Sequence, residues 1–232
     1  MVVGAHAADF VWRAGGVIAM TTQAGGTASV IALSYGERGE SGELWKEEGM
    51  TEARVKELRH AEAEAAAKAL GATFTCLDLG DYPLELDKEA LGRLADIIRE
   101  FAPDTLITHT DTDPFNPDHP VAFEVTERAR ALAAGAGVAS AFKTITPPKF
   151  LQFEPHQPEL CNFTPSVFAD ITSAFEAKQA AMAEMKAQRY LQTYYAQRAE
   201  QRGNHARRAS GRSEIRYAEA FQRIIPDVVD AL

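Results

Sequence analysis

Three polar side chains in this sequence have the types and spacing of a metal-binding set. His6 and Asp9 stand three positions apart, directly after a short apolar run, and His119 closes the later motif Asn116-Pro117-Asp118-His119. Two imidazoles and one carboxylate suit a zinc ion that keeps one coordination position open for water. Iron(II) or cobalt(II) fit the same donors. We therefore predict a catalytic metal site built from His6, Asp9 and His119.

A structural role is the alternative for the first pair. An aspartate after a strand commonly accepts the free N–H groups of a helix, so Asp9 could cap a helix that starts near Val11. The later motif favours a metal, because Asp118 can hold the ring of a ligand histidine in one tautomer. His109 and Asp111 begin the same loop, and they are further candidates to support the ligands.

The elements that must position these residues follow from the apolar runs. We predict strands over 2–5, 28–33, 73–77 and 105–108, and helices over 12–23, 51–70, 88–101 and 121–134. Strands that alternate with helices form a right-handed series with a mostly parallel sheet. The two parts of the metal motif then follow the first and fourth strands, at the edge where such sheets bind ligands.

The expected fold class is α/β, with a Rossmann-like, mostly parallel sheet, helices on both faces and a C-terminal helical elaboration. We expect one domain over 1–232, with an α/β core over 1–135 and edge strands and helices over 136–232. The predicted later elements are edge strands at 142–146 and 149–153, helices over 167–188 and 190–202, a basic polar segment over 203–212 and a closing segment over 217–232. The basic run is either solvated or covers a neighbouring subunit's site.

The bulk composition excludes several classes of partner. A net charge of -9 over 232 residues argues against nucleic acid, which needs a positive face. No apolar run is long enough to span a membrane, and no signal peptide is visible, so we expect a cytoplasmic protein without a membrane partner. Cys76 and Cys161 have no metal-site spacing, which favours incidental thiols. Assembly as a homo-oligomer is expected from base rates alone.

Several motifs, in order, resemble the signature of the PIG-L/LmbE-type zinc-dependent deacetylases. They stand here as His6-Ala7-Ala8-Asp9-Phe10, Gly36-Glu37-Arg38-Gly39-Glu40, Arg59-His60-Ala61-Glu62, Asn116-Pro117-Asp118-His119 and Tyr217-Ala218-Glu219-Ala220-Phe221. The resemblance covers most of the chain. It implies that His6, Asp9 and His119 hold zinc.

Two positions depart from the deacetylase signature. The family's general base is an aspartate, and the corresponding residue here is Ala8; the first histidine of its second motif is Asn116 here. A positioned acid or base contributes ~10²–10⁴-fold to a rate. Because both groups are missing, we expect amide hydrolysis to be lost and the metal to serve another reaction of water.

Longer stretches are similar to one divergent branch of that family, the 4-oxalomesaconate (4-carboxy-2-hydroxymuconate) hydratases of bacterial gallate and protocatechuate 4,5-cleavage. These stretches are 5–13, 34–41, 79–84 and 153–158, and the branch has alanine at the position of Ala8. The similarity implies a zinc-dependent hydratase that adds water to 4-carboxy-2-hydroxymuconate or its keto tautomer. The product would be 4-carboxy-4-hydroxy-2-oxoadipate.

A hydratase needs a base for the attacking water and a proton donor for the neighbouring carbon. Glu40 is our candidate for the base and Glu37 is the alternative, although a solvated loop would also explain this charged run. His156 is our candidate for the donor, because imidazole titrates near neutral pH and prolines stiffen its segment. The resemblance supports this choice over a purely structural histidine.

The implied substrate is a small tricarboxylate, and arginine suits carboxylates because its parallel N–H groups match their two oxygens. Arg38 is the first candidate, followed by Arg13 and Arg59. Arg59 equally suits an ion pair with Glu62, three positions later on one helix.

Two other functions stay open at this point. One is a zinc-dependent deacetylase of an amino sugar in which Glu40 replaces the missing base. The other is a non-catalytic relative that keeps the metal ligands and has lost the reaction.

Overall fold

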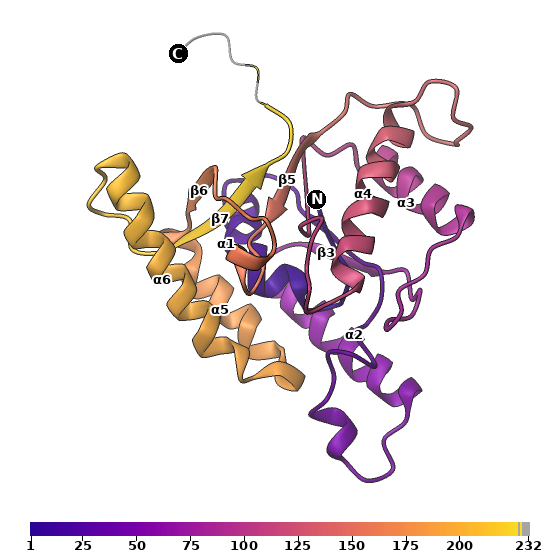
Figure 1. Ribbon diagram of the computed structural model, residues 1–232, viewed down its shortest axis with the longest axis horizontal. Coiled ribbons are helices and arrows are strands. Elements are labelled where there is room, and N and C mark those ends of the chain that lie inside the picture. The colour runs from indigo at the N-terminus through magenta and orange to yellow at the C-terminus, as the bar shows by residue number, and fades with distance from the viewer. Residues whose placement is uncertain (227, 229–232) are drawn as a thin grey trace.

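Seven strands form one sheet in the computed structural model, which describes residues 1–226 and 228 (Figure 1). Five of them are parallel: β1 (Val2–Gly4), β2 (Ser29–Ala32), β3 (Thr73–Cys76), β4 (Thr105–Thr108) and β5 (Lys149–Phe153). The last two, β6 (Val167–Asp170) and β7 (Ala218–Arg223), pair antiparallel. The order is β3-β2-β1-β4-β5-β7-β6, so strands of both halves of the chain join one sheet.

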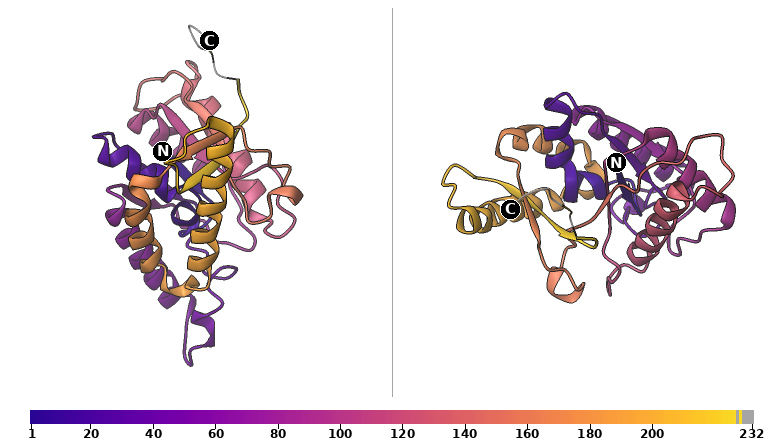
Figure 2. Two further views of the ribbon diagram at one scale, coloured as in Figure 1. Left: turned by 90° about the vertical axis from the view of Figure 1, so that its left-hand side faces the viewer. Right: turned by 90° about the horizontal axis from the view of Figure 1, so that it is seen from above.

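Six α-helices within the described residues cover both faces of this sheet. They are α1 (Asp9–Gln23), α2 (Glu52–Ala69), α3 (Lys88–Phe101), α4 (Asp118–Ala134), α5 (Phe175–Glu184) and α6 (Leu191–Ser210). Helices α3 and α4 enclose one apolar core, and α1, α2, α5 and α6 enclose the other. The ribbon views show α3 and α4 on one side of the molecule and α5 and α6 on the other (Figures 1 and 2). Side chains cap the N-termini of α2 and α3. The side chain of Thr51 accepts from the N–H of Arg54, and the side chain of Asp87 accepts from the N–H of Ala90.

The expected α/β class, the mostly parallel sheet and the helices on both faces are confirmed. Strand β1 lies between β2 and β4, so the strand order reverses beside it. In such sheets this reversal, at the carboxyl ends of the strands, is where ligands bind. The predicted helix over 88–101 and the strand over 105–108 match α3 and β4 residue for residue.

The second half of the chain differs from the prediction in three places. Residues 142–146 form no strand, and 149–153 form β5, which is paired on both sides and is not an edge strand. The predicted helix over 167–188 is instead β6, two short 3₁₀ helices and α5. Its many alanines favour a helix locally, but Val167 and Phe168 pair with β7, and tertiary pairing overrides that propensity.

The C-terminal segment also differs in its boundaries. Helix α6 continues to Ser210, so most of the predicted basic segment over 203–212 is helical. The closing segment over 217–232 contains β7, and its residues 227 and 229–232 lie outside the described part.

A buried ion pair fastens α1 to this second half. The carboxylate of Glu219 accepts from the backbone N–H groups of Gly16 and Val17, and Lys178 donates both to Glu219 and to the carbonyl of Trp12. Lys178 and Glu219 are both buried. The pair of Lys178 and Glu219 therefore links α1 to α5 and β7 by buried hydrogen bonds.

The described residues bear on the expectations about membrane spans and cysteines. None of the helices described is both long enough and apolar enough to cross a membrane. Cys76 and Cys161 are free thiols.

Candidate metal centre

Four side chains meet at the carboxyl ends of the parallel strands. They come from the loop after β1 (His6), the start of α1 (Asp9), the loop after β2 (Glu40) and the first turn of α4 (His119), and one donor atom of each lies within 4.8 Å of the others. Nδ1 of His6 lies 3.3 Å from Oε1 of Glu40. Nε2 of His119 lies 3.8 Å from both Asp9 and Glu40. The structure thus brings the three predicted ligands together and adds Glu40.

Each of the two histidines has one ring nitrogen beside a carboxylate and turns the other nitrogen toward this centre. Burial would lower the pKa of His6, but Glu40 and Asp118 outweigh it and hold this pKa well above its ordinary value. Nε2 of His6 lies 3.2 Å from Asp118, and Nδ1 of His119 lies 2.7 Å from Asp113. A carboxylate only accepts, so each of these nitrogens carries the ring proton. The opposite atoms, Nδ1 of His6 and Nε2 of His119, are buried and have no hydrogen-bond partner. Two buried ring nitrogens without partners, set beside carboxylates, fit a divalent cation, which would take the place of a proton there.

Asp9 is held in place by polar partners and does not cap α1. Its Oδ2 accepts from the N–H of His6 at 2.8 Å, and its Oδ1 accepts from Arg13 at 3.0 Å. The ring of His109 lies beside these groups: Arg13 lies 3.1 Å from its Nδ1. Its Nε2 accepts from the backbone N–H of Ala5 at 2.9 Å and lies 3.0 Å from Oδ2 of Asp9. His109 therefore supports the ligand set, as the sequence suggested, while Asp111 is exposed.

Neighbouring charges keep the carboxylates of Asp9 and Glu40 ionised. Burial would raise the pKa of Asp9, but His109 and Arg13 outweigh it and hold this pKa well below its usual range. Burial opposes ionisation of Glu40 as well, yet His6 and His119 lower its pKa well below the ordinary value. Burial and the neighbouring His119 lower the pKa of His109 to about 3. Both carboxylates are therefore ionised at neutral pH.

The loop after β2 turns sharply to deliver Glu40. Gly36 has φ +69°, and a Cβ atom there would lie 3.2 Å from the Cβ atoms of both His6 and Glu40. The side chain of Ser41 donates to the carbonyl of Gly36 and closes the turn. Glu37, the alternative base, lies 3.4 Å from Lys56 and accepts from the N–H of Tyr35. The geometry thus directs Glu40 at the donors and Glu37 toward Lys56.

Both oxygens of Glu40 also accept from side-chain amides. Asn116 Nδ2 lies 3.3 Å from Oε1, and Gln188 Nε2 lies 3.4 Å from Oε2. Asn116 thus contacts Glu40 at the position where the deacetylase signature has a histidine.

His156 follows β5 and is half-buried beside the centre. Its Nδ1 lies 3.3 Å from the hydroxyl of Tyr195, which accepts from Arg13 at 3.4 Å. Its carbonyl accepts from the hydroxyl of Tyr194. Burial and Arg13 lower the pKa of His156 to about 4, so the ring is neutral at pH 7.

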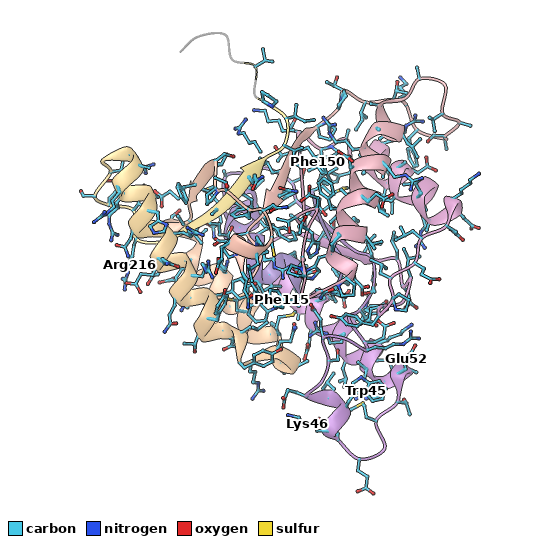
Figure 3. All side chains as sticks on the ribbon, in the orientation of Figure 1. Trp45, Lys46, Glu52, Phe115, Phe150 and Arg216 are labelled. Carbon is cyan, nitrogen blue, oxygen red and sulfur yellow. The ribbon has the colours of Figure 1, made fainter. Side chains whose placement is uncertain are left out.

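The three predicted arginines have different surroundings. Arg13 is buried against Asp9, whereas Arg59 is fully buried and donates to Glu62 and Gln188. The Arg38 guanidinium is half exposed and pairs with Glu52, which Figure 3 places near the periphery beside the segment of Trp45 and Lys46. Of the three, Arg13 is the one that contacts a metal donor.

Three residues at the site, Asp113, Tyr195 and Gln188, were not predicted from the sequence. Asp113 had a signal, because a carboxylate six positions before a ligand histidine in a Pro-rich loop can reach its ring. The other two come from the second half of the chain, and nothing in their local sequence marks them.

The family model described as PIG-L, GlcNAc-PI de-N-acetylase, matches residues 1–130. The chain belongs to the PIG-L family. The matched region contains all four donors of the centre. Metal dependence is a property of this family, and the donor set described above can hold such an ion.

Known proteins resemble this chain in sequence or in fold. The 4-oxalmesaconate hydratase of Pseudomonas putida KT2440 is 46% identical over 235 residues, which cover 100% of this chain and 91% of that protein. The crystal structure of GalB, the 4-carboxy-2-hydroxymuconate hydratase of P. putida KT2440, superimposes with a TM-score of 0.97 at 46% identity, over 100% of this chain and 98% of that one. The N,N'-diacetylchitobiose deacetylase of Pyrococcus horikoshii, at 19% identity and a TM-score of 0.78 over 95% and 81%, shares the fold.

Proposed function

We propose that this protein is a metal-dependent hydratase of aromatic-acid catabolism. The reaction is addition of water to 4-carboxy-2-hydroxymuconate, or to its keto tautomer 4-oxalomesaconate, to give 4-carboxy-4-hydroxy-2-oxoadipate. The observation that carries the proposal is the 46% identity to a named hydratase along the entire chain. The residues at the site are consistent with it, because Ala8 and Asn116 remove two groups that a deacetylase of this family uses.

We assign zinc to the centre, held by His6, Asp9 and His119. A divalent ion with these donors supplies Lewis acidity and makes water a nucleophile near neutral pH. Glu40 is the proposed base: it is ionised, and its Oε1 faces the donors. A fourth ligand role for Glu40 is the competing assignment, and the metal content of a Glu40 variant separates the two.

His156 is the proposed proton donor to the neighbouring carbon. Burial and Arg13 lower its pKa to about 4, so the ring carries no extra proton at pH 7. Nearby anions raise the pKa of an imidazole, and a substrate with three carboxylates brings such charge into the pocket. Arg13, buried beside the centre, is the proposed partner of one substrate carboxylate.

An ultraviolet assay tests the function. The protein should remove the absorbance of the conjugated dienol; chelation should stop the loss, and added zinc should restore it. Glu40→Gln should lower kcat by about 10²–10⁴-fold and keep one bound ion per chain. Glu37→Gln is the matched control and should keep most of the activity. No loss of the chromophore, or equal loss after chelation, would overturn the proposal.

A deacetylase is the second candidate, because the family model is described as a GlcNAc-PI de-N-acetylase. It requires acetate release from N-acetylglucosamine derivatives, with Glu40 acting as the base. Acetate measured in the same preparation decides between the two reactions.

A further inference from the structure

Gln188 is a buried amide that reaches the metal centre from the second half of the chain. It closes a short 3₁₀ helix, Lys186–Gln188, between α5 and α6, and 3% of its surface is exposed. Hydrogen bonds link its side chain to Trp12 of α1, Arg59 of α2 and Glu40 of the loop after β2.

The chemistry of these partners fixes which way the amide points. The indole N–H of Trp12 and the guanidinium of Arg59 approach the same atom, Oε1 of Gln188, at 3.3 and 3.2 Å. Both groups can only donate hydrogen bonds. The reverse orientation would set two donors against the NH₂ group and the amide carbonyl against a carboxylate. Nε2 must therefore face Glu40, where it lies 3.4 Å from Oε2.

This contact restrains the carboxylate that faces the metal donors. With Oε2 held by Gln188, the other oxygen, Oε1, lies 3.3 Å from Nδ1 of His6 and 3.8 Å from Nε2 of His119. Rotation of the carboxylate would break the contact with Gln188. A neutral amide achieves this without adding charge to a pocket that must admit an anionic substrate.

We propose that Gln188 is a positioning residue for the reaction: Trp12 and Arg59 hold its amide, and the amide keeps Oε1 of Glu40 aimed at the metal donors. The inference rests on the proposed role of Glu40 as the base. It also gives Arg59 a function other than the predicted binding of a substrate carboxylate, since its guanidinium acts through Gln188.

Two substitutions test this role. Gln188→Met keeps the volume and removes the amide, so kcat should fall about tenfold while KM stays within about twofold, because misplaced catalytic groups slow the reacting complex. Gln188→Glu sets a carboxylate against Glu40 and should lower kcat further. Gln192→Met is the matched control, because Gln192 donates to the carbonyl of Met182, and it should keep the parent kcat. Parental kcat in both Gln188 variants, or a change confined to KM, would overturn the proposal.

A structural readout separates this inference from the hydratase assignment. Crystal structures of metal-free parent and Gln188→Met protein should show the Glu40 carboxylate turned away from His6 in the variant alone. The melting temperature and the zinc bound per chain should match the parent. If the parent does not hydrate the dienol, the proposed function fails, yet the orientation of Glu40 still tests the role of Gln188. An unchanged Glu40 in the variant structure contradicts that role.

Discussion

Nδ1 of His119, in the first turn of α4, lies 2.7 Å from Oδ2 of Asp113, six residues earlier in the loop before that helix. The other oxygen of Asp113 accepts from the backbone N–H groups of Phe115 and Asn116 at 2.9 and 3.3 Å. One carboxylate thus shapes the loop and selects the tautomer of a metal ligand.

We expect Asp113→Asn to weaken metal binding. The amide oxygen will stay with the two backbone N–H groups, so the NH₂ group will face His119. Nδ1 must then accept, and the ring proton moves to Nε2, which blocks the metal-facing atom. Loss of such a supporting carboxylate typically lowers metal affinity about 10–100-fold. Competition with a chromophoric chelator measures it. Asp111→Asn, at an exposed position of the same loop, is the control. Equal metal affinity in the parent and both variants would contradict the role of Asp113 in selecting the tautomer of His119.

Ala8 leaves the ligand motif without a second carboxylate, and its side chain is completely buried. We expect Ala8→Asp to lower kcat/KM for hydration on the order of tenfold or more, the effect of about 1.4 kcal/mol in the transition state. The added charge would compete for the open coordination position and repel an anionic substrate. Ala8→Asn has the same size without the charge and should lose less. If Ala8→Asp hydrates as well as the parent, the alanine has no part in the choice of reaction.

His156 should make the stability of the metal-free protein depend on pH. Its pKa is about 4 in the folded protein and 6.5 in an unperturbed chain. Below pH 6.5 the unfolded chain binds a proton that the folded protein excludes. Stability present above about pH 6.5 is therefore lost as the pH falls toward 4.

The substitution His156→Gln isolates this contribution. Between pH 7 and 4.5 the parent should lose on the order of 2 kcal/mol more stability than the variant. Urea unfolding in the presence of a chelator gives both values. Equal losses in the two proteins would show that burial does not depress this pKa.

The pair of Lys178 and Glu219 should contribute strongly to stability. Lys178→Met leaves the buried Glu219 carboxylate without its cation, and breaking a buried pair in this way costs about 3–5 kcal/mol. The double variant Lys178→Met/Glu219→Gln should lose less, because no unpaired charge remains. Lys186→Met, at an exposed lysine nearby, is the control for urea unfolding. A loss below about 1 kcal/mol in Lys178→Met would refute a structural role for this pair.

The first half of the fold was predictable because its signals are local. The apolar runs and helix starts between Val2 and Ala134 carry the periodicity and caps that define elements, and the strand order then places His6 and His119 at one edge. β6 was missed, because its four residues adjoin an alanine-rich stretch and depend on pairing with β7.

The partners of the ligands were harder to predict than the ligands. Asp118 was expected to hold a ligand histidine and does so, but its partner is His6, 112 positions away, while the adjacent His119 uses Asp113. Helical geometry directs neighbouring side chains apart, so adjacency in sequence is a poor guide to hydrogen-bond partners. Gln188 could not be found at all without the fold, since it meets Glu40 across 148 positions.

The two halves of the chain contribute different residues to the metal centre. Every donor of the centre precedes residue 120, whereas Gln188, His156 and Tyr195 arrive from beyond residue 150. The donors of the centre and the residues that support it from the other side are therefore encoded in separate stretches. A substitution in the later stretch should therefore change what surrounds the donors and leave the four donors themselves in place.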